Sequence, residues 1–115
     1  MTVTLYHNSR CSKSRQTLAL LEDRGLDIEV IRYLDTPPTA QELKRIIALL
    51  GISAHDLLRR GEAEYADLGL NADQDEVNLI DAMVAHPRLI QRPIVIANGQ
   101  ARIGRPPEDV LDILS

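Results

Sequence analysis

The chain has 115 residues, of which 44% are apolar and 26% are charged, and its formal net charge is −4. This length supports a single core, and the acidic balance with only three aromatic residues argues against a nucleic-acid partner. No apolar run approaches the ~20 residues of a membrane span, and no signal segment follows Met1, so we expect no membrane association. The single cysteine excludes an internal disulfide and a cysteine-based zinc site, and a free thiol points to a cytoplasmic location.

The first third of the chain predicts a strand, a helix and a second strand. Residues 2–6 alternate β-branched and apolar side chains, and residues 28–34 show a second strand-like pattern. Between them, Ser12 is expected to cap a helix that ends before Gly25. Because one helix separates the two strands, we expect them to pair in parallel through a right-handed crossover.

The middle of the chain predicts helices only. Thr39 and Glu42 form a capping box, and Ser53 with Asp56 starts a short second helix. Helical spacing predicts one apolar stripe after the first box, formed by Leu43, Ile46, Ile47 and Leu50. An acidic loop precedes a further helix that ends before Pro87. The residues of that helix expected to face inward are Val77, Ile80, Met83 and Val84.

The last third predicts a hairpin and a final helix. Residues 94–97 and 101–103 flank Asn98-Gly99, a pair typical of a type I′ turn, and a proline pair then begins the helix. Its expected inward residues are Val110, Leu111 and Leu114. The predicted fold is therefore α/β, with a mixed four-stranded sheet in the order β-α-β and then β-β-α. We expect one domain, residues 1–115, with a helical block inserted at roughly residues 37–88.

Cys11 is the main candidate for a reactive group. It lies between a strand end and a helix start, where free N–H groups and the helix dipole place positive potential on the sulfur. Arg10, Lys13 and Arg15 surround it without a nearby carboxylate in the sequence, which favours the thiolate. The alternative is a small buried apolar residue. Polar neighbours on both sides argue against such burial, so we expect a reactive thiol at an exposed helix start.

Two further residues are candidates by their spacing from Cys11. Ser14 follows one helical turn later, so its hydroxyl could donate a hydrogen bond to the thiolate. The alternative role is that of an ordinary polar residue in the first turn of a helix. His7 precedes Cys11 by four residues and could polarise the site, or it could simply bond the loop backbone.

Several other chemistries fail on spacing. A cysteine phosphatase loop needs an arginine where Thr17 stands, and a dithiol oxidoreductase needs a second cysteine where Ser14 stands. The glycine pair at positions 99 and 104 lacks the Lys-Ser/Thr of a phosphate-binding loop. The three histidines, His7, His55 and His86, have no metal-ligand spacing, so no metal site is expected.

The segment Tyr6-His7-Asn8-x-Arg10-Cys11-Ser12-Lys13-Ser14-Arg15 resembles the active-site segment of the glutaredoxin-dependent arsenate reductases, the ArsC-like branch of the thioredoxin fold. Ser9 stands where a proline is common in that family, and Ser12-Lys13 where Gly-Thr is frequent. Further motifs agree in order along the chain: Tyr33-Leu34-Asp35-Thr36-Pro37-Pro38, Gly51-Ile52-Ser53, Leu57-Leu58-Arg59, Arg92-Pro93-Ile94-Val95 and Arg102-Ile103-Gly104-Arg105-Pro106. The resemblance covers essentially the whole chain and implies a thioredoxin-like fold.

The resemblance also implies roles for individual residues. Cys11 matches the nucleophile that attacks arsenate, and His7 and Ser14 match residues that favour its thiolate. Pro93 matches the cis-proline opposite the active cysteine. Three arginines match those that bind the oxyanion: Arg59, Arg92 and Arg105. A different interpretation makes these three scattered surface arginines, each tied to a carboxylate such as Asp56 or Glu108.

The resemblance implies partners as well. Glutathione would serve as co-substrate and glutaredoxin would complete the reduction of arsenate or a related oxyanion, with no tightly bound cofactor. One alternative is a regulatory binding protein like the Spx regulators, which contact RNA polymerase, although Ser14 removes the Cys-x-x-Cys switch that they carry. Another is a protein that forms mixed disulfides with glutathione but reduces no oxyanion.

Overall fold

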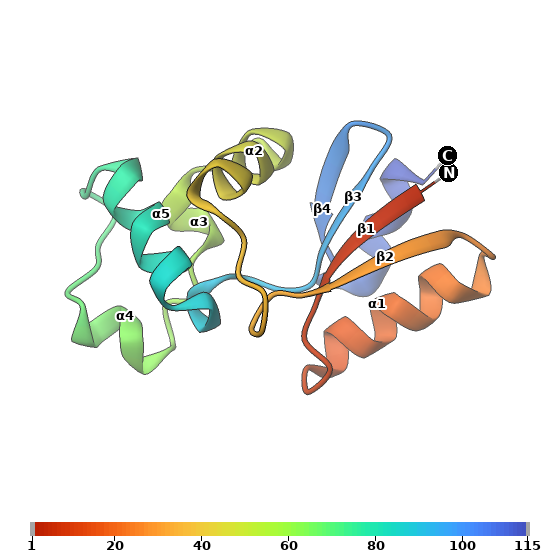
Figure 1. Cartoon of the computed structure of the whole chain (residues 1–115), viewed down its shortest axis with the longest axis horizontal. Helices are drawn as coiled ribbons and strands as arrows, with labels where there is room; N and C mark the ends of the chain where they lie inside the picture. Colours follow the sequence, from red (N-terminus) through yellow and green to blue (C-terminus); the bar gives the residue numbers. More distant parts are fainter. Residues whose placement is uncertain (1, 115) are drawn as a thin grey trace. The chain divides into compact units, whose positions relative to one another are not determined.

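The computed structural model describes residues 2–114, and the chain divides into two compact units (Figure 1). The sheet unit comprises the residues up to Thr36 together with those from Arg92 onward. The helical unit comprises Pro37–Gln91 and contains the block expected as an insertion. Within residues 2–114, no helix has the length and apolar character that a membrane crossing requires.

The sheet unit is built on four strands: β1 (Thr2–His7), β2 (Asp27–Arg32), β3 (Ile94–Ala97) and β4 (Gln100–Ile103). Their spatial order is β2-β1-β3-β4. β1 pairs with β2 in parallel and with β3 antiparallel, and β3 and β4 form an antiparallel hairpin. The predicted mixed four-stranded sheet is therefore confirmed.

The core of the sheet unit lies between the sheet and two helical segments. α1 (Ser12–Asp23) and the 3-10 helix η2 (Pro107–Ile113) pack against each other and against the strands. The buried residues of this core are Val3, Leu5, Leu21, Val95, Ala97, Val110, Ile113 and Leu114. The predicted last helix is present, but it is closed by the tighter i→i+3 bonds, such as the one from Asp109 N–H to the Pro106 carbonyl.

The hairpin between β3 and β4 forms as predicted. Asn98 has φ of +54° and Gly99 has φ of +71°, so both central residues occupy the left-handed region that a type I′ turn requires. The Asn98 side-chain amide also donates to the carbonyl of Ile113 at 2.9 Å. This bond joins the hairpin to the end of η2.

The helical unit contains α2 (Ala40–Leu50), α3 (Ala54–Leu57), α4 (Ala63–Asp67), α5 (Glu76–Ala85) and the 3-10 helix η1 (Pro87–Leu89). The predicted capping box of Thr39 and Glu42 is confirmed, and the short helix predicted to start at Ser53 also begins with a capping box, whereas α4 was not expected. The predicted inner face of α5 is partly wrong. Val77 is 62% exposed, and Leu79 is buried in its place beside Ile80 and Met83. Because α5 packs against both α2 and α3, its buried face is rotated relative to the one that spacing suggested.

Candidate active site

Cys11 is the N-cap residue of α1, directly after the loop that leaves β1. This corrects the prediction that Ser12 caps the helix, because Ser12 is already its first helical residue. The Cys11 amide donates to the Asn8 carbonyl at 3.0 Å, and its side chain accepts no capping hydrogen bond. The sulfur therefore lies at the positive end of the helix, as expected, without being used to satisfy the helix terminus.

The expected exposure of Cys11 is wrong, since the residue is buried with only 8% of its surface accessible. The burial is not apolar on every side. Nη2 of Arg105 lies 3.6 Å from Sγ, although the two residues are 94 positions apart in the chain. This guanidinium places a positive charge beside the sulfur. The buried sulfur of Cys11 therefore has a positive charge beside it, and that charge comes from Arg105, far away in the sequence.

Ser14 and His7 form a buried pair beside the loop. Ser14 Oγ lies 2.6 Å from His7 Nδ1 and accepts a hydrogen bond from the Asn8 N–H at 3.0 Å. The hydrogen bonds observed for Ser14 thus join it to His7 and Asn8, whereas the spacing had suggested the sulfur. If His7 carries its proton on Nδ1, Ser14 accepts two bonds and keeps its own proton for another acceptor. If Nδ1 is bare, Ser14 donates to it. The tautomer of His7 therefore determines whether the Ser14 hydroxyl donates to His7 or to another acceptor.

The charge state of His7 is set by groups that the sequence interpretation did not identify. Burial, followed by the positive charges of Arg32 and Arg15, holds the pKa of His7 below its ordinary value of 6.5. His7 is therefore neutral at neutral pH. Arg32 is opposite His7 in the parallel pairing of β1 and β2, and Arg15 Nη1 donates to the Ser9 carbonyl at 2.9 Å. Arg32 could have been identified as a neighbour of His7 only from the pairing register of β1 and β2.

Two of the three predicted arginines come together in the sheet unit. Arg105 Nε donates to the Arg92 carbonyl at 2.7 Å, and its Nη2 faces Cys11. Nε and Nη1 of Arg92 are buried and have no hydrogen-bond partner among residues 2–114. Buried donors of a charged group without partners are costly, and an anion would satisfy them. The prediction that Pro93 follows a cis peptide bond is confirmed, and Pro106 after Arg105 follows one as well.

Gly104 holds these two segments together. Its N–H donates to the Pro93 carbonyl at 2.9 Å. A Cβ at this position would lie 2.5 Å from Thr17 Oγ1 and 2.8 Å from Pro93 Cγ. Glycine is therefore needed here for close approach, which lets the residue before Arg105 pack directly on α1.

Arg59 lies in the helical unit and has a partner already. Its Nη1 forms a salt bridge with Glu62 Oε1, and the second carboxylate oxygen of Glu62 lies 3.5 Å from Nη2 of Arg88. The interpretation that Arg59 is tied to a neighbouring carboxylate is thus correct, but the carboxylate is Glu62, since Asp56 pairs with Arg60. The two residues are held in one turn, which the Glu62 N–H closes by donating to the Arg59 carbonyl at 3.2 Å.

The remaining histidines belong to the helical unit and show no sign of metal binding. His55 Nε2 lies 2.8 Å from the hydroxyl of Tyr65. Across residues 2–114, no group of three or more His, Cys, Asp or Glu side chains is placed to hold a metal ion.

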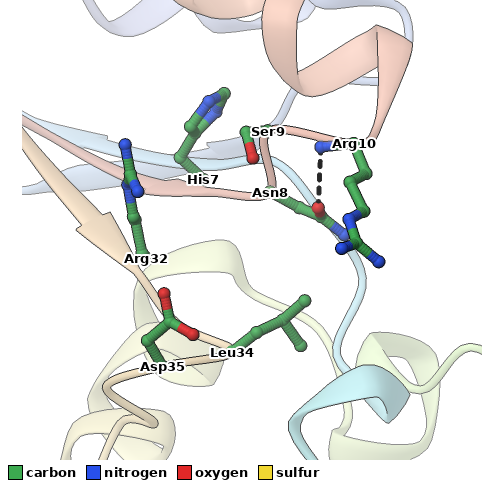
Figure 2. A pocket seen from close by; sticks show the side chains of 7 residues that line it. All are labelled: His7, Asn8, Ser9, Arg10, Arg32, Leu34 and Asp35. Carbon is green, nitrogen blue, oxygen red and sulfur yellow. Dashed lines mark hydrogen bonds between the residues drawn. The ribbon is translucent and has the colours of Figure 1, made fainter.

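A cavity of about 340 Å³ lies beside the loop that precedes Cys11 (Figure 2). Its lining comes from the end of β1 and the following loop, and from the end of β2 and the following turn: His7, Asn8, Ser9, Arg10, Arg32, Leu34 and Asp35. The sheet unit therefore offers a nucleophile at a helix start, the guanidinium of Arg105 facing it, the buried unpaired donors of Arg92, and a cavity beside the preceding loop. Such an arrangement can hold an oxyanion next to a thiolate.

Comparisons with known proteins identify the family of this chain. A family model described as ArsC family matches residues 6–113. The chain is 52% identical to YfgD of Escherichia coli K12, described as uncharacterized, over 97% of this chain and 96% of that protein. It is 48% identical to an arsenate reductase of Neisseria meningitidis serogroup A, over 97% of each chain. A solved arsenate reductase from Vibrio cholerae superposes with a TM-score of 0.96 at 51% identity, over 99% of this chain and 98% of that one. The chain therefore belongs to the ArsC family.

Proposed function

We propose that this protein is an arsenate reductase that uses Cys11 as its nucleophile. The observation that carries the proposal is the pairing of Cys11 Sγ with Arg105 Nη2 at 3.6 Å. Arg105 Nε is bound to the carbonyl of Arg92, whose own side chain has two buried and unsatisfied donors. A cysteine sulfur beside a guanidinium, with further donors left for an anion, is what an attack on a bound oxyanion requires. The relatives described as arsenate reductases support the same choice of substrate.

The proposed chemistry begins with attack of the Cys11 thiolate on arsenic. A sulfur–arsenic bond forms, and one arsenate oxygen takes up protons and leaves as water. A glutathione thiolate then attacks the Cys11 sulfur of the adduct. A sulfur–sulfur bond forms, and the sulfur–arsenic bond breaks with its electron pair left on arsenic. A glutaredoxin thiol then takes over the glutathione from Cys11 as a mixed disulfide. Two thiols thereby lose two electrons, arsenic passes from the +5 to the +3 state, and arsenite and the Cys11 thiol are released. Because two external thiols supply the electrons, one cysteine in the chain suffices.

The other candidate residues assist this step. Arg92 and Arg105 hold the oxyanion and offset the charge that develops on its oxygens. His7 and Ser14 act on Cys11 through the shared hydrogen bond, because a neutral His7 with its proton on Nδ1 leaves the Ser14 hydroxyl free to donate to the thiolate. The third arginine matched by the family resemblance, Arg59, has its guanidinium bound to Glu62.

A coupled assay tests the proposal. Purified protein is mixed with arsenate, glutathione, glutaredoxin and glutathione reductase, and the oxidation of NADPH is followed. We expect arsenate-dependent oxidation that is lost when glutathione or glutaredoxin is omitted. If NADPH oxidation continues without glutaredoxin, arsenate is still the substrate but glutaredoxin is not the reductant.

Absence of arsenate-dependent oxidation would overturn the proposal and favour one of the alternatives. Formation of a mixed disulfide between Cys11 and glutathione, measured by mass spectrometry, would then indicate a thiol oxidoreductase without oxyanion turnover. Capture of RNA polymerase by the intact protein, without any thiol exchange, would indicate a regulator.

A further inference from the structure

The cavity beside residues 8–10 contains charges that the oxyanion chemistry does not use. Arg10 and Arg32 line it at opposite sides, and Leu34 and Asp35 extend along its lower edge (Figure 2). Among residues 2–114, neither guanidinium nor the Asp35 carboxylate forms an ion pair. The cavity therefore offers two free cations and one free anion to a ligand.

The walls of the cavity are fixed by backbone bonds. His7 and Arg32 are opposite each other where β1 and β2 pair. The turn after β2 is closed by hydrogen bonds from the N–H groups of Asp35 and Thr36 to the Arg32 carbonyl, at 3.0 and 2.9 Å. On the other wall, the Arg10 N–H donates to Asn8 Oδ1 at 3.0 Å (Figure 2). The charged side chains thus project from a preformed frame, which lowers the cost of ordering them around a ligand.

The cavity adjoins the nucleophile through a shared loop. Cys11 follows Arg10 directly, and its N–H donates to Asn8, which lines the cavity. His7 is common to both places, since it lines the cavity and contacts Ser14 Oγ at 2.6 Å. The cavity and the nucleophile are therefore joined by one short loop and by His7.

We propose that this cavity, with Arg10, Arg32 and Asp35, is the binding site for the tripeptide part of glutathione, the thiol that reacts with Cys11. The proposal rests on the proposed function for its choice of a thiol co-substrate. Glutathione carries two carboxylates and one ammonium group, the complement of two guanidiniums and one carboxylate. The volume of about 340 Å³ is within the range of small-ligand sites, and the half-exposed Leu34 offers apolar contact to the aliphatic part of the peptide.

Exchange with a disulfide tests the site without arsenate. The Cys11 thiolate attacks one sulfur of glutathione disulfide, the new sulfur–sulfur bond forms as the old one breaks, and the departing glutathione thiolate takes a proton from water. Cys11 is oxidised and the departing glutathione is reduced. Rates are measured by mass spectrometry for this reagent and for hydroxyethyl disulfide, which is uncharged. The ratio of the two rates reports recognition of the peptide and cancels changes in the reactivity of Cys11.

We expect Arg32→Gln and Arg10→Gln each to lower this ratio by about tenfold, because each removes charge-assisted bonds to a carboxylate. Asp35→Asn should lower it less and only for disulfides with a free ammonium group. Arg24→Gln, a loss of charge at the far end of α1, is the matched control and should leave the ratio unchanged. The disulfide of glutathione monoethyl ester, whose glycine carboxylate is blocked, identifies the arginine that binds that carboxylate. In the variant that lacks this arginine, blocking the glycine carboxylate should lower the rate ratio only slightly.

The outcomes separate this site from the proposed function. If the wild-type protein reduces arsenate but the ratio is the same in Arg32→Gln, Arg10→Gln and Arg24→Gln, the glutathione site is wrong and the reductase remains. If arsenate is not reduced but the two cavity variants lose the preference for glutathione disulfide, the site stands and the reductase is wrong. A wild-type ratio near one, together with equal binding of S-methylglutathione by all variants in calorimetry, would overturn the site directly.

Discussion

In the helical unit, the guanidinium of Arg59 contacts Glu62, whose second oxygen lies 3.5 Å from Arg88, so its charge is balanced within its own neighbourhood. In the sheet unit, Arg92 has two buried nitrogens without a partner among residues 2–114, and Arg105 faces the Cys11 sulfur. An arginine that is already paired is held in place by the fold. An arginine with buried, unsatisfied donors carries a desolvation cost that a bound anion relieves. The contrast places the main anion-binding capacity in the sheet unit.

The largest effect should come from removing the nucleophile. We expect Cys11→Ser to abolish arsenate reduction in the coupled assay, because a serine hydroxyl is far less nucleophilic than a thiolate at neutral pH. Serine is also a better N-cap than cysteine, so the melting temperature should stay the same or rise. Ser12→Ala, one position later, is the control and should retain activity. Retained activity in Cys11→Ser would remove Cys11 from the mechanism, and unfolding would indicate a structural cysteine.

Arginine-to-lysine changes sharpen the comparison between the units. Arg92→Lys and Arg105→Lys keep the charge but lose the planar fork, so each should weaken arsenate or sulfate binding by about 1–3 kcal/mol. Arg59→Lys should have a smaller effect, because Arg59 shares its guanidinium with Glu62. Calorimetric titration of the wild-type protein and the three variants measures this order. Equal affinities in all four proteins would show that these arginines form no oxyanion site.

Alanine substitutions at two glycines, one in each unit, test how closely each unit is packed at that position. Gly104→Ala would place a methyl group 2.5 Å from Thr17 Oγ1, so we expect a loss of about 1–3 kcal/mol in the free energy of unfolding from overpacking. Gly61→Ala in the helical unit meets nothing within 4 Å and needs no left-handed backbone, so its effect should be close to zero. Urea denaturation of the two variants gives the difference. An equal effect of both changes would contradict the close packing at Gly104.

Removing the carboxylate that pairs with Arg59 should reduce the difference in anion binding between the two units. Glu62→Gln removes the charge that holds Arg59, so the anion affinity of the helical unit should rise about twofold to fivefold, as expected for a partly exposed ion pair. Asp56→Asn frees Arg60 instead and is the matched control. Sulfate titration distinguishes them. If Glu62→Gln leaves the affinity unchanged while Arg92→Lys lowers it, Arg59 has no part in the site.

The smallest expected effect is a pH dependence of stability in the sheet unit. The pKa of His7 is lowered in the folded protein, so below pH 6.5 the unfolded chain binds more protons than the folded one. The free energy of unfolding should therefore fall as the pH drops from 7 through the lowered pKa. His7→Asn should flatten this dependence, whereas His86→Asn in the helical unit should keep it. Denaturation at several pH values measures the slopes, and an unchanged slope in His7→Asn would contradict the assignment.

The candidate site was only partly predictable from the sequence. Cys11, His7 and Ser14 lie within residues 7–14, and their spacing in the sequence identified them as candidates. Arg92 and Arg105 were identified by family resemblance, because no local pattern joins residues so far apart. The burial of Cys11 and the pairing of Ser14 with His7 were missed. Both depend on what packs around the loop, and periodicity carries no information about that.

The sequence by itself determined the local elements of this protein. The capping box at Thr39, the helix start at Ser53 and the type I′ hairpin depend on bonds between residues a few positions apart, and all of them formed as predicted. The β-α-β opening also formed, because one short helix connects its two strands. Only the tertiary structure decided which face of α5 is buried and which charges meet. Arg105 reaches Cys11 across 94 residues, and Arg32 reaches His7 through strand pairing. Such contacts are selected by how the whole core packs, so the free energy that fixes them is not contained in any short stretch of chain.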